Sequence, residues 1–116
     1  MNKRQPILYL SGPMTGIKDL NVPLFNKITR KLRKKGYKVV NPPELDRLER
    51  TRTWESSLRR DLKFVVTCDE IATLPNWKKS RGANLEVYVG KALSMPIHSY
   101  KYYLASKRRI KNYWTH

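Results

Sequence analysis

The chain is poor in cysteine and histidine, the residues that build disulfides and most metal sites. Cys68 is the only cysteine among 116 residues, so an intramolecular disulfide and cysteine-based zinc sites are excluded. The two histidines, His98 and His116, form no pattern typical of a catalytic triad or a metal site. We therefore expect no metal and no other cofactor, and a reducing, cytoplasmic environment.

Long apolar runs and nucleotide-binding signatures are also missing. The longest apolar runs, such as residues 7–10, are far shorter than the roughly 20 residues that cross a bilayer. Residues 1–6 are charged and lack the apolar segment of a signal peptide. Neither G-x-x-x-x-G-K-[ST] nor G-x-G-x-x-G occurs, which weakens NTPase and dinucleotide-binding hypotheses. These absences predict a non-membrane protein of the cytoplasm.

Acidic residues are scarce, with 9 Asp and Glu against 25 Lys and Arg and a formal charge of +16. Residues 87–116 contain no acidic residue at all. Such a surface attracts phosphate-bearing ligands or nucleic acid, and the alternative is a surface whose charge only maintains solubility. The densest cluster lies on an expected helix and its exit and comprises Lys27, Arg30, Lys31, Arg33, Lys34, Lys35 and Lys38.

Apolar segments alternate between strand and helix periodicity along the chain. Expected strands cover residues 5–11, 37–40, 70–74 and 95–99. Expected helices begin at the N-cap candidates Asn21, Thr53 and Ser80, and a polar stretch covers residues 44–52. This alternation predicts an α/β fold, Rossmann-like or flavodoxin-like, with a parallel sheet of about four strands and helices on both faces.

We expect one α/β domain over residues 1–99, followed by a basic, aromatic C-terminal tail over residues 100–116. The tail looks helical and is expected to pack on the domain or on a neighbouring subunit. Alternatively, its interleaved basic and aromatic residues would stack on single-stranded nucleic acid. Its apolar and aromatic residues are Tyr102, Tyr103, Leu104, Ile110, Tyr113 and Trp114.

Ligands of an open parallel sheet gather at the carboxyl ends of its strands, near the N-termini of the following helices. The loop after the first expected strand contains two glycines and two hydroxyl groups, which suit a phosphate or a sugar. The alternative is an ordinary strand-to-helix turn. The candidate binding residues here are Ser11, Gly12, Pro13, Met14, Thr15 and Gly16.

The loop after the third expected strand combines a hydroxyl, cations, a glycine and a helix start, all of which bind phosphate. Glu86 follows within that helix beside Leu85 and Val87, so we expect a partly desolvated and unusually basic carboxylate. The alternative is a solvated surface glutamate. The candidate binding residues of the loop are Asn76, Trp77, Ser80, Arg81 and Gly82.

Several ordered motifs together resemble the nucleoside 2-deoxyribosyltransferase-like superfamily, and most of all its DUF4406 branch, whose members are often encoded by phages or prophages. The resemblance covers about residues 7–98 and implies the cytoplasm of a bacterium or of a phage-infected host. The residues that carry it are 9–16, 39–42, 60–62, 74–77, 80–83 and Glu86.

This resemblance implies a flavodoxin-like dimer or higher oligomer that breaks the bond between a sugar C1' and a nucleobase. Glu86 matches the catalytic glutamate, a nucleophile that forms a covalent glycosyl intermediate. Asp61 matches an acidic residue near the base and would assist its departure. By itself, Asp61 would be read as a surface ion pair with a neighbouring arginine. Tyr9 matches a strand-end tyrosine near the sugar.

Ser80 separates two branches of this resemblance. Transferases acting on free nucleosides tend to carry an aspartate six residues before the glutamate, whereas nucleoside 5'-monophosphate N-glycosidases carry a phosphate-binding serine. Ser80 beside Lys79 and Arg81 therefore predicts a (deoxy)nucleoside 5'-monophosphate substrate and water as acceptor. The alternatives are a nucleoside 2-deoxyribosyltransferase and a non-catalytic nucleotide- or nucleic-acid-binding protein. The nucleobase and the type of pentose stay open.

Overall fold

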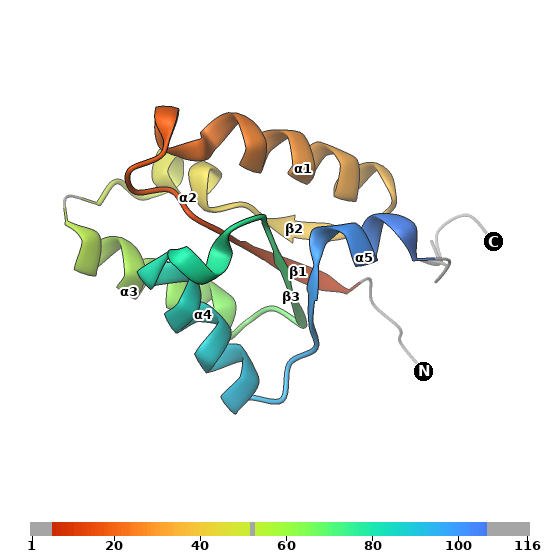
Figure 1. Ribbon diagram of the computed structural model, residues 1–116. Coiled ribbons are helices and arrows are strands. Elements are labelled where there is room, and N and C mark those ends of the chain that lie inside the picture. Colours follow the sequence, from red (N-terminus) through yellow and green to blue (C-terminus); the bar gives the residue numbers. More distant parts are fainter. Residues whose placement is uncertain (1–5, 52, 107–116) are drawn as a thin grey trace.

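Four short parallel strands form the centre of the fold (Figure 1). The computed structural model describes residues 6–51 and 53–106. The strands are β1 (Ile7–Ser11), β2 (Lys38–Val40), β3 (Glu70–Thr73) and β4 (Ile97–Ser99), in the order β2-β1-β3-β4. Because β1 and β3 are paired on both sides, their side chains are almost entirely buried.

Helices cover both faces of this sheet, so the predicted α/β fold class is confirmed (Figure 1). Helices α1 (Val22–Lys34) and α5 (Tyr100–Ala105) pack on one face, and α3 (Trp54–Val65) and α4 (Arg81–Ala92) on the other. Alternate residues of β1 point to opposite faces: Leu8 and Leu10 contact the α1 side, and Tyr9 the α3 and α4 side. No helix in the described part of the chain is long and apolar enough to span a membrane.

The predicted caps of two helices are confirmed. The Thr53 side chain accepts a hydrogen bond from the Ser56 N–H at 3.0 Å, and the Ser56 hydroxyl accepts one from the Thr53 N–H at 3.1 Å. The Ser80 side chain accepts a hydrogen bond from the Ala83 N–H at 3.2 Å. Short polar side chains therefore fix the starts of α3 and α4, the two helices that supply the carboxylates described below.

One helix was not predicted, and one predicted cap is wrong. The polar stretch over residues 44–52 had no predicted secondary structure, and α2 (Pro42–Leu48) occupies much of it. Proline is compatible with the first helical turn, so Pro42 and Pro43 both end the preceding strand region and start this helix. Asn21 does not cap α1 through its side chain: the residue adopts a left-handed conformation, and its amide donates to the Pro13 carbonyl at 2.9 Å.

Helix α5 ties the start of the C-terminal tail to the sheet. Tyr103 is completely buried, and its hydroxyl donates a hydrogen bond to Glu70 Oε1 at 2.9 Å. From α1, the Lys35 ammonium donates to the carbonyls of Leu104 and Ser106. The expectations for Ile110, Tyr113 and Trp114 lie outside the described residues.

Gly12, directly after β1, allows the ends of β1 and β3 to lie close together. A Cβ atom at this position would lie 2.7 Å from Leu74 Cβ. That atom is bonded directly to the backbone, so it cannot move aside without moving the chain. We expect Gly12→Ala to lower the free energy of unfolding by about 1–3 kcal/mol, measured by chemical denaturation.

Gly82→Ala is the matched control for this substitution. A Cβ atom at Gly82 meets only Trp54 Nε1, at 3.9 Å, so the added methyl group makes an ordinary contact. The control should unfold at the same denaturant concentration as the wild type or a higher one. Equal destabilisation by the two substitutions would contradict the steric explanation.

Candidate active site

The carboxylate of Glu86 lies at the carboxyl end of β1, held by two hydroxyl groups of that strand. The Tyr9 hydroxyl donates to Glu86 Oε2 at 2.7 Å, and the Ser11 hydroxyl donates to Oε1 at 2.7 Å. Residues 9 and 11 are two positions apart, so their side chains emerge on the same face of the sheet. Tyr9 and Ser11 are completely buried, and Glu86 is only 6% exposed. Each carboxylate oxygen therefore has one protein donor.

Burial makes Glu86 an unusually weak acid. Burial, together with a smaller effect of the charge of Asp61, raises the pKa of Glu86 from 4.5 to about 7, although the hydrogen bonds from Ser11 and Tyr9 act in the opposite direction. The pKa of Tyr9 is raised well above its ordinary value, mainly by burial and then by the charges of Glu86 and Asp61. Tyr9 thus stays a hydrogen-bond donor while Glu86 titrates near neutral pH.

Asp61, on α3, is held by a buried arginine rather than by a surface ion pair. The Arg60 side chain is 3% exposed, and its Nε and Nη2 atoms lie 2.9 and 2.8 Å from Asp61 Oδ1. Its Nη1 atom contacts Asp46 Oδ1 of α2 at 2.6 Å and the Glu49 carbonyl at 2.9 Å. Burial raises the pKa of Asp61 above its ordinary value, although the contacts with Arg60 lower it. One guanidinium therefore orients Asp61 and joins α2 to α3.

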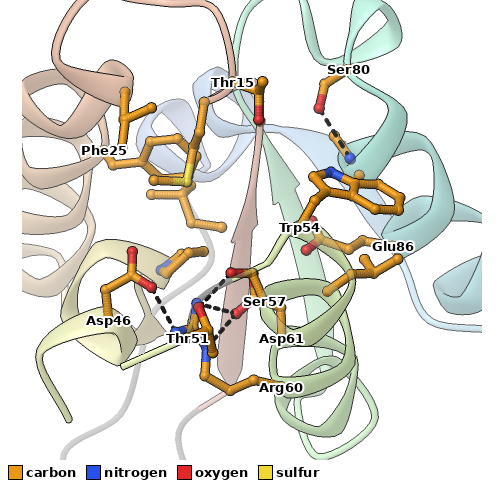
Figure 2. Close-up of a pocket in the computed structure, with 18 of the residues that line it drawn as sticks. Thr15, Phe25, Asp46, Thr51, Trp54, Ser57, Arg60, Asp61, Ser80 and Glu86 are labelled. Atoms are coloured by element: carbon orange, nitrogen blue, oxygen red, sulfur yellow. Dashed lines mark hydrogen bonds and ion pairs between the residues drawn. The ribbon is translucent and has the colours of Figure 1, made fainter. Parts of the chain in front are cut away.

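A pocket of about 300 Å³ opens onto Glu86 and Asp61 (Figure 2). It is enclosed by the loop after β1 and by residues of α1, α2, α3 and α4. Figure 2 shows Phe25 on one side and Trp54 on the other, with Glu86 and Asp61 near the end of the strand between them. The predicted site residues that line this pocket are Gly12, Met14, Thr15, Asp61, Ser80, Gly82 and Glu86.

A second hollow of about 610 Å³ adjoins this pocket at the start of α4. Its wall includes the basic residues Lys79 and Arg81, and the Arg81 guanidinium lies 4.0 Å from the centre of the Trp54 ring. Stacking on an aromatic ring leaves the N–H groups of a guanidinium free in their plane. The residues shared by both hollows are Thr15, Trp54, Ser80 and Gly82, and the predicted residues Pro13, Asn76 and Arg81 line the second one only.

Four of the predicted site residues line neither hollow. Tyr9 and Ser11 are buried behind Glu86, where they hold its carboxylate. Trp77 packs against the apolar core beneath α4. Gly16 has a φ angle of 81° and supports the turn after β1. For Ser11, predicted to contact substrate, the structure therefore indicates a role in positioning Glu86.

Sequence reasoning missed several residues of the pocket. Trp54 directly follows the cap Thr53, which places it at the ligand-bearing edge of the sheet, although an aromatic residue there is equally typical of the buried face of a helix. Asp46 was missed because α2 itself was missed. Arg60 belongs to the motif at residues 60–62, but nothing local indicates that its side chain is buried, since an arginine is usually exposed. The other lining residues that were not site candidates are Leu10, Leu20, Phe25, Pro42, Thr51, Thr53, Ser57, Leu58 and Ala83.

The described residues offer no cluster of three or more histidine, cysteine, aspartate or glutamate side chains that would hold a metal ion. The basic cluster on α1 is partly engaged in internal contacts. Arg33 forms a bidentate pair with Glu44 at 2.6 and 2.8 Å, and Lys35 binds the carbonyls near the end of α5. At least these two cations therefore support the fold.

The architecture is that of a Rossmann-like α/β protein. It is similar to the solved 2-deoxyribosyltransferase of the psychrotolerant bacterium Bacillus psychrosaccharolyticus, with a TM-score of 0.61 and 22% identity over 78% of this chain and 69% of that chain. A family model described as a domain of unknown function, DUF4406, matches residues 6–99. The chain belongs to the DUF4406 family. No curated protein sequence matches it.

The raised pKa of Glu86 predicts how stability depends on pH. The folded protein binds the proton of the Glu86 carboxyl group more tightly than the unfolded chain does. The stabilisation of the fold by this proton is therefore fully present below the ordinary pKa of 4.5 and is lost as the pH rises through about 7. Replacing Glu86 with neutral glutamine removes this loss. We expect Glu86→Gln to be more stable than wild type above about pH 8, by on the order of 3 kcal/mol, with the difference vanishing in mild acid.

Denaturant unfolding of both proteins across this pH range measures the effect. Glu55→Gln removes an exposed carboxylate from α3, the helix that packs with α4 on the same face of the sheet, and serves as the control. A constant difference between wild type and Glu86→Gln at all pH values would contradict the burial of a titrating carboxylate.

Proposed function

We propose that this protein cleaves the N-glycosidic bond of a nucleoside or deoxynucleoside 5'-monophosphate and releases the base. The observation that supports this most directly is the desolvated Glu86 carboxylate, held by Tyr9 and Ser11 at the floor of a pocket that also contains Asp61. Two carboxyl groups facing one cavity are the groups that glycoside cleavage requires. The fold likeness to a 2-deoxyribosyltransferase that serves as a biocatalyst for nucleoside synthesis agrees with this class of substrate.

In the first step, ionised Glu86 attacks C1' while the bond between C1' and the base nitrogen breaks. Near neutral pH the pair of Glu86 and Asp61 holds one proton, and the reactive form carries it on Asp61, which leaves Glu86 ionised. The leaving base takes up this proton, so the base departs neutral and Asp61 becomes a carboxylate. The hydrogen bonds from Tyr9 and Ser11 favour the ionised form of Glu86, and burial removes the water that would weaken its attack. The negative charge of Glu86 also stabilises an oxocarbenium-like transition state.

In the second step, water attacks C1' of the glycosyl ester and Glu86 leaves as a carboxylate. Asp61 accepts the proton of that water, which restores the starting state. Arg60 keeps Asp61 oriented through both steps, because its guanidinium is fixed on the other side by Asp46. A free base in place of water would complete a deoxyribosyl transfer instead.

The second hollow provides the groups for the 5'-phosphate. Ser80 accepts a hydrogen bond from the Ala83 N–H, which leaves its own hydroxyl hydrogen for an incoming anion. Arg81, Lys79 and the start of α4 add positive charge, and Gly82 leaves space next to Trp54. We therefore assign the phosphate to this hollow and the sugar to the pocket with Glu86.

Base release from a panel of ribo- and deoxyribonucleoside 5'-monophosphates, followed by chromatography, tests the proposal. We expect wild type to release the base from at least one nucleotide, and Glu86→Gln to lose at least about 10³-fold in rate because it has no nucleophilic carboxylate. Glu55→Gln should react like wild type. Adding a different free base distinguishes transfer from hydrolysis, since only transfer yields a new nucleotide. Release from no nucleotide, or equal release by Glu86→Gln, would contradict the proposal and favour a binding protein.

Ser80→Asp tests the phosphate assignment while preserving the helix cap. Aspartate caps a helix as well as serine does, so the fold should be retained, but its charge repels a phosphate. We expect the KM for the monophosphate to rise by about tenfold or more, whereas kcat/KM for the unphosphorylated nucleoside should not fall. Ser94→Asp adds the same charge beyond the end of α4 and is the control. Equal effects of the two substitutions would remove the phosphate from this hollow.

A further inference from the structure

We call the pocket that contains Glu86 and Asp61 the catalytic pocket. A third hollow, of about 510 Å³, lies on its other side from the start of α4. We name this hollow the α3 groove, because residues of α3 and residues 49–51 and 53 form its walls. It shares Thr51, Thr53 and Arg60 with the catalytic pocket and shares no lining residue with the hollow at Ser80. Figure 2 shows the same arrangement, with Ser80 at one end of the site and Thr51 and Arg60 at the other. The catalytic pocket therefore has a basic hollow on each side.

The α3 groove is strongly positive. Arg50, Arg59 and Lys63 line it and are exposed, and no carboxylate among residues 6–51 and 53–106 forms an ion pair with any of them. Arg59 and Lys63 lie four residues apart on α3, so they project from the same side of the helix. Glu49 is the one acidic residue in the described lining, and the charge of Arg60 is offset by Asp46 and Asp61. The groove thus has a net positive charge available to a ligand.

The ligand chemistry that fits this groove is a second phosphate. Flexible cations and hydroxyl groups such as those of Thr51 and Ser56 bind the oxygens of a hard anion. Nucleotides commonly carry phosphate at the 5' and 3' positions of the sugar. With the 5'-phosphate assigned to the hollow at Ser80, a 3'-phosphate is the anion that a basic hollow on the other side of the pocket would bind.

We propose that the α3 groove is a second phosphate subsite, so that the preferred substrate carries phosphate on both sides of the reacting sugar. This inference rests on the proposed function, because it uses the placement of the sugar beside Glu86. Two ligands share the required chemistry: a free nucleoside 3',5'-bisphosphate and a nucleotide within a single strand. A groove open to solvent admits both, because the chain of a strand can leave through its mouth.

Binding to catalytically inactive Glu86→Gln tests this without requiring turnover. Dissociation constants are measured by calorimetry at physiological ionic strength for nucleoside 5'-monophosphates, the matching 3',5'-bisphosphates and 5'-phosphorylated trinucleotides of the same base. We expect the bisphosphate to bind about tenfold more tightly than the monophosphate. A further gain with the trinucleotide identifies a strand as the ligand, and equal affinity identifies the free bisphosphate.

Two variants made in the Glu86→Gln background, each lacking three positive charges, distinguish binding of phosphate at the α3 groove from general attraction of phosphate to the basic surface. The groove variant carries Arg50→Gln, Arg59→Gln and Lys63→Gln, and the control carries Lys27→Gln, Arg30→Gln and Lys34→Gln on exposed positions of α1. The groove variant should lose the gain from the second phosphate and keep its affinity for the monophosphate within about twofold, whereas the control should keep the gain.

Equal affinity for mono- and bisphosphate, or equal losses in the two charge variants, would overturn the second subsite. Those outcomes are independent of base release by the wild-type protein, which tests the proposed function separately. Circular dichroism and thermal unfolding of each variant verify that the substitutions, all at exposed positions, leave the fold intact.

Discussion

The site depends on one buried interaction, the pair of hydrogen bonds by which Tyr9 and Ser11 hold the carboxylate of Glu86. Burying a carboxylate is costly unless donors satisfy it, and both donors come from one face of a central strand. The two ends of the interaction are brought together by close packing of α4 on the sheet, which Gly90 permits because a Cβ atom there would collide with Ile71. The same desolvation that makes the contact expensive gives Glu86 a pKa of about 7.

Acidic side chains line the pocket, whereas basic side chains surround it on the surface. Three of the nine acidic residues, Asp46, Asp61 and Glu86, line a single pocket in a chain with a net charge of +16. Arg60 joins two of these carboxylates, and exposed cations surround the pocket at Arg81 and in the α3 groove. Such a surface attracts anionic ligands towards an interior that favours a developing positive charge on a sugar. This combination of an acidic pocket and basic surroundings agrees with the nucleotide substrate proposed above.

Local rules predicted much of the scaffold. The alternation of apolar segments predicted a parallel sheet of four strands, and the caps at Thr53 and Ser80 follow from short-range hydrogen bonding. The predictions failed at residue types that are compatible with two different local structures. Pro42 ends a strand segment and also starts α2, and Asn21 donates to a distant carbonyl instead of capping α1. Such choices depend on partners that are remote in sequence, which periodicity does not contain.

The sequence by itself determined the class of fold and the caps that start α3 and α4, and it singled out Glu86 as a candidate carboxylate, because periodicity, caps and an acidic residue within an apolar stretch are local properties. Only the tertiary structure decided that Ser11 supports Glu86 from behind, that Arg60 is buried between Asp46 and Asp61, and that Trp54 separates two hollows. The physical reason is that hydrogen-bond partners and burial arise from segments up to 77 positions apart, such as Tyr9 and Glu86, which meet only when the sheet and its helices have packed.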